Sequence, residues 1–160
     1  MKVKFFTTGG TIDKIYFDEL SKFEVGDSYV EHVLQQAQIA FEYSIEEILR
    51  KDSLDITAEE RQVIFERVRD AKEDRIVITH GTDTMAETGQ VLQSIPGKTI
   101  VLTGALQPAR FHESDAAFNI GMAVAAVQSL DAGVYLAING RIFNPATTKK
   151  NRDANRFEAI

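Results

Sequence analysis

The sequence predicts an α/β domain in which a mostly parallel sheet carries helices on both faces, so that the molecule has three layers. Short β-prone apolar segments alternate along the chain with segments of helical spacing, which is typical of consecutive βαβ units. Several strand segments are continuous apolar runs, which suit strands covered on both faces. The length of 160 residues favours a single domain over residues 1–160 and leaves no room for a second.

The first strand is expected at residues 3–7, because a β-prone apolar run there stops abruptly at two glycines. Residues 12–27 mix charged, aromatic and glycine residues without a period, and this pattern indicates a long loop. Long loops in compact domains are often functional. Residues 30–38 have the spacing of a short helix, and the loose alternation of residues 39–48 predicts a second strand.

A capping box marks the start of the next helix. Thr57 is followed three residues later by Glu60, and apolar residues at helical spacing come behind them. Residues 75–79 are a continuous apolar run and predict a third strand. A helix follows that strand, and its inward side chains are expected to be Met85, Val91, Leu92 and Ile95.

Two further strands complete the predicted sheet, at residues 99–103 and 133–138. Ser114 is expected to cap the alanine-rich helix between them, which extends to Leu130. The chain from Arg141 onward is polar and basic. Right-handed crossovers between parallel strands place helices on both faces, so the sheet is expected to be Rossmann-like.

The composition excludes several classes of protein and site. The formal net charge is 18 − 24 = −6, which argues against nucleic acid and membrane surfaces as partners. The absence of cysteine rules out disulfides, thiolate metal sites and a cysteine nucleophile. The three histidines form no HExxH-type pair, so no metal site is expected. No apolar run approaches the ~20 residues of a membrane span and no signal peptide is recognised, so a cytoplasmic location is expected.

The chemistry is expected where the carboxyl ends of the strands meet, because ligands of open α/β sheets bind there. Three strand ends deliver small, hydroxylated or glycine residues, at residues 7–11, 80–84 and 103–105. Each segment alone fits an ordinary turn or helix cap. Neither GxxxxGK[ST] nor GxGxxG nor GxSxG is present, so no cofactor is expected. A pocket with two threonines, an aspartate and a lysine can support acyl transfer, in which a threonine hydroxyl needs a base and oxyanion donors.

Two segments, Thr8-Gly9-Gly10-Thr11-Ile12 and His80-Gly81-Thr82-Asp83-Thr84-Met85, resemble the signature motifs of the bacterial-type L-asparaginase/glutaminase family. Further segments match the family in the expected order, namely Asp52-Ser53-Leu54-Asp55, Leu102-Thr103-Gly104-Ala105-Leu106, Ser114-Asp115 with Phe118-Asn119, and Thr148-Lys149-Lys150-Asn151. The resemblance covers nearly the whole chain and implies an amidohydrolase that converts L-asparagine, and possibly L-glutamine, to the acid and ammonia.

The resemblance also implies catalytic roles for individual residues. Thr11 would attack the side-chain amide of asparagine and form an acyl-enzyme. Thr82, Asp83 and Lys149 would form the second catalytic group and assist proton transfer. A lysine that acts as a base must be neutral, so burial should depress its pKa, and the neighbouring Lys150 competes for this role.

Other matched residues are implied to bind substrate. Asp83 would contact the α-ammonium group through a charge-assisted bond, and Ser53 would contact the α-carboxylate. The remaining substrate-binding positions are Gly10, Gly81, Thr82 and Ala105. His80 is expected to pack under its turn rather than act in catalysis.

Departures from the family pattern concern the lid and the length. Residues 12–27 would be the lid that closes over substrate, but Phe23 stands where the family has a tyrosine that activates the first threonine. We hypothesise that Tyr16 in the same segment substitutes for it. The chain resembles only the amino-terminal domain of typical members, so weaker substrate affinity is expected, and a homodimer would have to use surfaces of this domain.

Each assignment has an alternative. Thr11 fits a turn hydroxyl, and Thr82 with Asp83 fits a helix cap. A chain with this pocket but no second domain also fits a non-catalytic module that binds or senses an amino acid. A subunit of a tRNA-dependent amidotransferase is a third interpretation, although the sequence offers no extra segment for docking tRNA.

Overall fold

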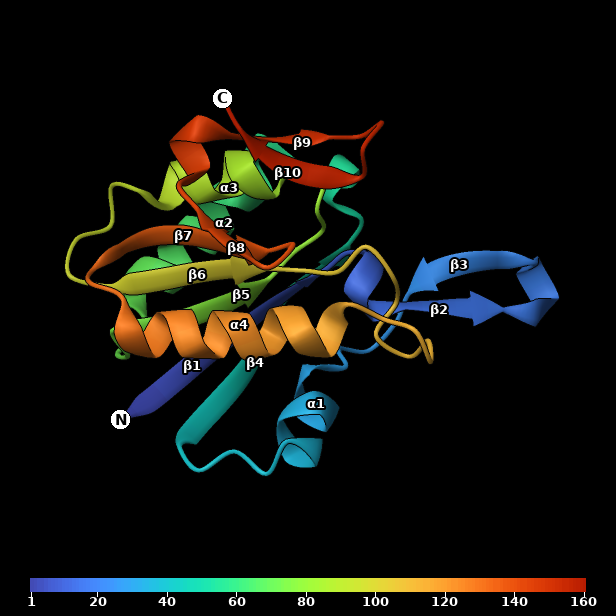
Figure 1. Ribbon diagram of the computed structural model, residues 1–160, viewed down its shortest axis with the longest axis horizontal. Coiled ribbons are helices and arrows are strands. Elements are labelled where there is room, and N and C mark those ends of the chain that lie inside the picture. Colours follow the sequence, from blue (N-terminus) through green and yellow to red (C-terminus); the bar gives the residue numbers. More distant parts are fainter.

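A computed structural model describes residues 1–160 and contains a six-stranded sheet in the order β4-β1-β5-β6-β7-β8 (Figure 1). The strands β1, β4, β5, β6 and β7 are parallel, and β8 pairs antiparallel with β7 at one edge. The predicted mostly parallel sheet is therefore confirmed. The strands are β1 (Lys2–Gly9), β4 (Glu42–Lys51), β5 (Arg75–Thr79), β6 (Thr99–Thr103), β7 (Gly133–Ile138) and β8 (Arg141–Phe143).

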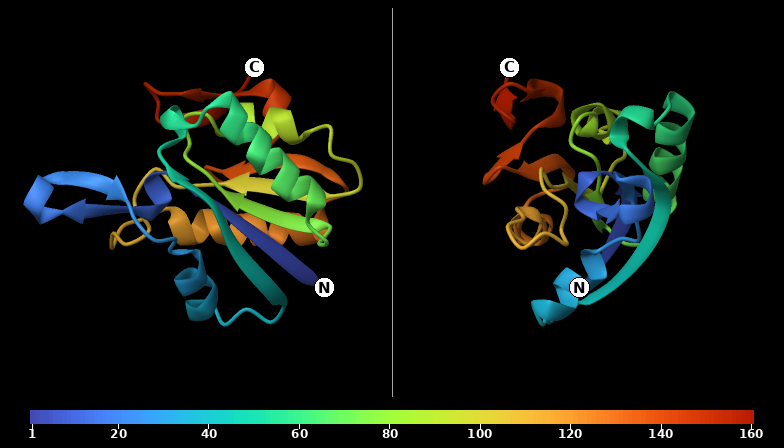
Figure 2. Two further views of the ribbon diagram at one scale, coloured as in Figure 1. Left: turned by 180° about the vertical axis from the view of Figure 1, so that it is seen from behind. Right: turned by 90° about the vertical axis from the view of Figure 1, so that its right-hand side faces the viewer.

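Two helices cover each face of the sheet, which gives the predicted three layers (Figure 2). Side chains alternate between the faces, so neighbours in sequence enter different core clusters. Phe6, Ile78 and Leu102 pack toward α2 and α3, whereas residues one position earlier on the same strands pack toward α1 and α4. The helices are α1 (Val30–Gln36), α2 (Ala58–Asp70), α3 (Met85–Leu92) and α4 (Ala116–Ser129).

The predicted capping box is confirmed, the N-cap of α4 is Asp115 rather than the predicted Ser114, and one predicted inward side chain is wrong. The Glu60 N–H donates to Thr57 Oγ1 (3.2 Å), and the Thr57 N–H donates to the Glu60 carboxylate (3.0 Å), which completes the capping box. Ser114 Oγ accepts from the Ala116 N–H (3.1 Å) at the start of α4. Val91 is 39% exposed, because it lies on the face of α3 that points away from the sheet.

The segment predicted as a loop at residues 12–27 is instead a β-hairpin that projects from the body of the molecule (Figure 1). Its elements are η1 (Thr11–Asp13), β2 (Lys14–Phe17), η2 (Asp18–Leu20) and β3 (Lys22–Val25). The turn ends with Ser21 in the left-handed region (φ 49°). Each strand has only four residues and both faces are largely solvated, so no apolar alternation marks them in the sequence.

A second antiparallel hairpin follows β8, on the same face of the sheet as α2 and α3 (Figure 1). Phe157 anchors it: the side chain is 3% exposed, belongs to the core cluster under α2 and α3, and packs on Phe143 with ring centroids 6.3 Å apart. The polar composition hid these strands from the sequence prediction. They are β9 (Thr148–Asn151) and β10 (Arg156–Ala159), preceded by η4 (Pro145–Thr147). None of the helices has the length and hydropathy needed to cross a membrane.

Candidate active site

Three turns at the carboxyl edge of the sheet are in direct backbone contact. Gly10 (φ 88°) lies so close to Gly81 that a Cβ on Gly10 would be 2.5 Å from the Gly81 nitrogen. A Cβ on Gly81 would in turn be 2.6 Å from Ser53 Oγ. Only glycine fits at both positions. Because Thr11 and Thr82 directly follow the two touching glycines, the turns that carry the predicted catalytic threonines converge with the turn that carries Ser53.

Hydrogen bonds between strand ends hold this convergence in place. Thr8 Oγ1 donates to the carbonyl of Thr79 (2.9 Å), which joins the turns after β1 and β5. Thr84 Oγ1 donates to the carbonyl of Ser53 (2.9 Å), and the Gly10 N–H donates to the carbonyl of Lys51 (2.8 Å). All of these bonds are shielded or partly shielded from water, so they fix the relative positions of the three turns.

His80 is fully buried and packs under its turn, as the sequence predicts. Its Nδ1 lies 2.7 Å from the carbonyl oxygen of Gly81 and must donate to it, so Nε2 accepts from Thr88 Oγ1 (2.8 Å). Thr88 Oγ1 also accepts from Arg61 Nε (3.2 Å). Burial lowers the pKa of His80 to about 4, so the ring is neutral at physiological pH. The chain of bonds from Arg61 through Thr88 and His80 thus positions the Gly81 carbonyl.

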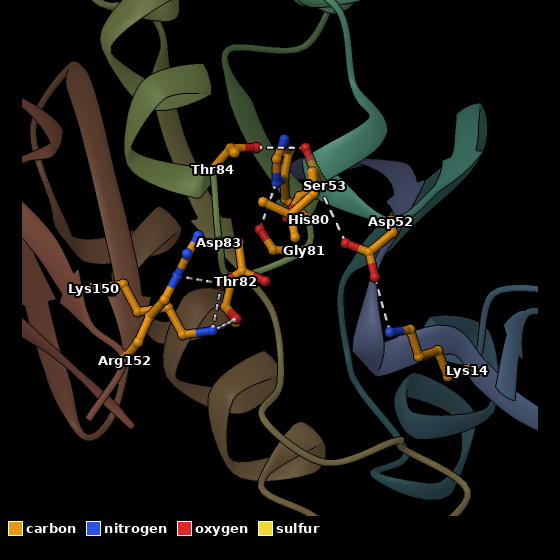
Figure 3. A network of polar contacts seen from close by, with 11 residues as sticks. Lys14, Asp52, Ser53, His80, Gly81, Thr82, Asp83, Thr84, Lys150 and Arg152 are labelled. Atoms are coloured by element: carbon orange, nitrogen blue, oxygen red, sulfur yellow. Dashed lines mark hydrogen bonds and ion pairs between the residues drawn. The ribbon is translucent and has the colours of Figure 1, made fainter. Parts of the chain in front are cut away.

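The lysine beside the second threonine is Lys150, and the assignment of this place to Lys149 is wrong. Lys150 Nζ donates to Thr82 Oγ1 (2.7 Å) and to Asp83 Oδ1 (3.1 Å), as Figure 3 shows. The hairpin register explains the difference, because cross-strand partners share a face. Lys150 pairs with the buried Phe157 and faces inward, whereas Lys149 pairs with Glu158 and is exposed.

Two further ion pairs at the site were not predicted. Arg152 Nε lies 3.4 Å from Asp83 Oδ1, so the carboxylate faces two cations (Figure 3). Lys14 Nζ lies 2.8 Å from Asp52 Oδ2. Although partial burial raises the pKa of Asp52, hydrogen bonds from Lys14 and the Leu54 N–H hold it below its usual value. Neither pair was predicted, because Arg152 lies in the polar segment after Arg141 and Lys14 in the charged segment 12–27, and neither segment has a hydrophobic period.

The remaining predicted residues differ in their surroundings. The Ser53 hydroxyl is buried and has no hydrogen-bond partner within the chain. Thr11 is partly exposed. Ala105 is 1% exposed and its methyl group belongs to the core, so only its main chain can contact a ligand. Tyr16 is 51% exposed on β2, where its ring packs on Phe23, and its hydroxyl makes no hydrogen bond.

Asp13, two residues after Thr11, closes the base of the β2–β3 hairpin. Its carbonyl accepts from the Gly26 N–H (2.8 Å), and its carboxyl oxygen accepts from the Tyr29 N–H (2.9 Å). Burial raises the pKa of Asp13 to about 6, although the Tyr29 N–H and the nearby Arg110 lower it in part. Sequence analysis did not single out this residue, because a lone aspartate in a polar segment is usually solvated.

Comparisons with known proteins agree with this geometry. A family model described as "Asparaginase, N-terminal" matches residues 2–160. The chain is 32% identical over its whole length to an L-asparaginase of Thermococcus kodakarensis. The thermostable L-asparaginase structure from that organism superposes with a TM-score of 0.87 at 30% identity over 100% of this chain. A probable cytoplasmic L-asparaginase of Campylobacter jejuni superposes with a TM-score of 0.83 at 27% identity over 99% of the chain. The chain spans about half the length of these proteins, 51% of the first two and 52% of the third.

Proposed function

Because the chain belongs to the asparaginase family and matches its N-terminal domain, we propose that it hydrolyses the side-chain amide of L-asparagine to L-aspartate and ammonia. The observation that carries the proposal is the bonding of Lys150 to both Thr82 and Asp83, on a turn that touches the turn of Thr11. A hydroxyl held by an amine, on a turn that contacts the turn of a second, partly exposed threonine, is suited to acyl transfer.

Thr11 is the proposed nucleophile. Its Oγ1 forms a bond to the amide carbon while the carbon–nitrogen bond breaks, and the hydroxyl proton leaves with the ammonia. Water then adds to the ester, which releases L-aspartate and returns a proton to Thr11. Main-chain N–H groups of the Gly10 and Gly81 turns are positioned by the backbone contact and are suited to stabilise the negatively charged oxygen of each intermediate.

The second catalytic group of the proposal is Thr82 with Lys150 and Asp83. Lys150 donates to the Thr82 oxygen, so the Thr82 proton points elsewhere and can be given to a ligand or a water. The unpartnered hydroxyl of Ser53 is proposed to bind the α-carboxylate of substrate, and Asp83 its α-ammonium group. Tyr16 is the proposed activating group for Thr11; its side chain is 51% exposed and its hydroxyl makes no hydrogen bond.

The two adjacent lysines provide a matched test. Thr11→Ala is expected to lower the rate of ammonia release from L-asparagine about 10³-fold, because the nucleophile is lost. Lys150→Met is expected to lower it about 10²-fold through the loss of the bond to Thr82. Lys149→Met removes the same charge from an exposed side chain and should change the rate by less than about twofold. Equal rates for Lys149→Met and Lys150→Met would contradict the proposed site.

A non-catalytic module that binds an amino acid is the second candidate. It is favoured by the exposed position of Tyr16, whose hydroxyl makes no hydrogen bond. In that case L-aspartate binding would be measurable by calorimetry, while parent and Thr11→Ala would release ammonia at the same background rate.

The setting of the activity is part of the proposal. By similarity to the probable cytoplasmic relative, we propose that the activity is cytoplasmic. We also propose that two copies of the chain form a homodimer. Sedimentation at several protein concentrations measures the number of copies.

A further inference from the structure

The carboxylate proposed to receive the substrate ammonium already faces two cations of the chain itself. Lys150 Nζ and Arg152 Nε both approach the same oxygen of Asp83, at 3.1 and 3.4 Å. Lys150 is mostly buried and also holds Thr82. Arg152 is 65% exposed, and its guanidinium has no ion-pair partner other than Asp83. An ammonium group therefore has to displace Arg152 from this carboxylate or share it with two other cations.

The ion pairs at the site lie on both sides of the three turns. Figure 3 places Lys14 and Asp52 on one side of the turns, and Asp83, Lys150 and Arg152 on the other. Arg152 therefore adds a second cation, beside Lys150, at the carboxylate of Asp83. A second cation at Asp83 repels an incoming ammonium group, whereas a ligand without an ammonium group does not meet this repulsion.

We propose that Arg152 determines substrate specificity at this site, by occupying the place of the ammonium group and favouring ω-amides of dicarboxylic acids that carry no amino group. Succinamate, which is asparagine without its ammonium, is the simplest member of this class. The proposal rests on the proposed amidohydrolase function. A planar guanidinium matches the geometry of a carboxylate better than an ammonium group does. Arg152 is therefore suited to compete with the ammonium group of a substrate for the carboxylate of Asp83.

The expected size of the effect follows from the exposure of Arg152. An ion pair at the surface contributes little, so its displacement by asparagine changes specificity several-fold rather than abolishing turnover. The measured quantity is the ratio of kcat/KM for succinamate to kcat/KM for L-asparagine. Arg152→Gln is expected to lower this ratio about fivefold, and Arg152→Lys, which keeps the charge, by less than about twofold.

Arg156 is the matched control, because it lies on the same hairpin, is 64% exposed and pairs with Glu158 (2.9 Å) rather than with Asp83. Arg156→Gln should leave the ratio unchanged. A loss of overall hairpin structure would change both Arg152→Gln and Arg156→Gln, whereas the proposed role changes only the first. An unchanged ratio in Arg152→Gln overturns the assignment to Arg152.

A binding measurement separates this proposal from the proposed function. The dissociation constants of succinate and L-aspartate are measured by calorimetry for the parent chain and for Arg152→Gln. The parent is expected to favour succinate, and the substitution to reduce that preference about fivefold. If the chain hydrolyses no amide but shows this shift, the amidohydrolase function fails and the role of Arg152 stands. If amides are hydrolysed and neither ratio responds to Arg152→Gln, only the role of Arg152 fails. If no amide is hydrolysed and neither succinate nor L-aspartate binds, both proposals are overturned.

Discussion

The turns that carry Thr11, Ser53 and Thr82 are joined by backbone contacts between buried glycines, whereas the β2–β3 hairpin that carries Tyr16 is half exposed. The turns cannot move apart without breaking buried hydrogen bonds such as that from Thr8 to Thr79. The hairpin is held at its base by Asp13 and along its side by ring contacts of Phe23.

This difference separates two tasks that a site of this kind must perform. Reacting groups have to be held to a fraction of an ångström, which a buried and closely packed backbone provides. A segment that covers the site has to open and close, which needs few buried contacts and a low local stability. The residues assigned to chemistry lie in the first region, and the residue assigned to activation, Tyr16, lies in the second.

The largest expected effect on stability comes from a substitution that forces the turns of Gly10 and Gly81 apart. Gly10→Ala adds a Cβ that would overlap the backbone of Gly81 and also strains a backbone with φ 88°. Together these effects should cost about 4 kcal/mol of the free energy of unfolding. Gly97→Ala is the control, because Gly97 has φ 72° but open space around it, so only strain of about 1 kcal/mol remains. Urea denaturation measures both, and equal losses would show that close backbone contact contributes nothing.

The next largest effect is the pH dependence of stability, to which Asp13 at the hairpin base and His80 under the second turn contribute with opposite signs. The pKa of Asp13 is raised to about 6 in the folded state, so between about pH 4 and 6 the folded chain binds a proton that the unfolded chain has lost. Stability linked to Asp13 therefore falls as the pH rises through this window, by up to about 3 kcal/mol. The pKa of His80 is lowered to about 4, so its contribution has the opposite sign and stability rises with pH up to about 6.5.

In the parent, the contributions of Asp13 and His80 to the pH dependence of stability have opposite signs and partly cancel. Asp13→Asn should remove the first contribution, so that stability rises with pH as the titration of His80 requires. The amide keeps an oxygen for the Tyr29 N–H and carries no charge, so the variant should gain up to about 3 kcal/mol over the parent between pH 4 and 7. Urea denaturation at pH 4, 5, 6 and 7 measures the two curves. Asp18→Asn, at the exposed tip of the same hairpin, is the control and should leave the pH dependence unchanged. Parallel curves for parent and Asp13→Asn would contradict the burial of a titrating carboxyl at the hairpin base.

A smaller effect tests the support under the second turn. Thr88→Val keeps the shape of the side chain but leaves His80 Nε2 and Arg61 Nε without their partner, which should cost about 2 kcal/mol. The Gly81 carbonyl would then lose its fixed donor, so ammonia release should fall more than the stability of the fold predicts. Thr147→Val replaces an exposed threonine and should change neither quantity. A stable variant with full activity would show that the His80 chain of bonds does not position the turn.

The sequence predicted five of the six strands of the sheet and the turns of Thr11 and Thr82, because these parts have strong local signals, but it missed β8. Continuous apolar runs mark β5 and β6, and glycines next to threonines mark the strand ends. It missed the two hairpins, because strands of four largely polar residues lack the alternation by which a strand is recognised. The choice between Lys149 and Lys150 failed for the same reason. It depends on a cross-strand register set by Phe157, and the sequence alone does not show which residues pair across a turn.

The smallest expected effect concerns the outer contact of the β2–β3 hairpin. Phe111, in the loop between β6 and α4, packs on Phe23 with ring centroids 5.8 Å apart, and both rings are nearly half exposed. Phe111→Ala should therefore cost less than about 1 kcal/mol of global stability. Because the hairpin has few other contacts, the loss should appear locally, as several-fold faster hydrogen exchange of the amides in β2 and β3 with unchanged exchange in β5 and β6. Phe118→Ala, on α4 and 65% exposed, removes a ring that has no aromatic partner and should leave hairpin exchange unchanged. Unchanged exchange in Phe111→Ala would mean that the hairpin is held at its base, by the bonds of Asp13 and the Lys14–Asp52 ion pair, and not by its outer rings.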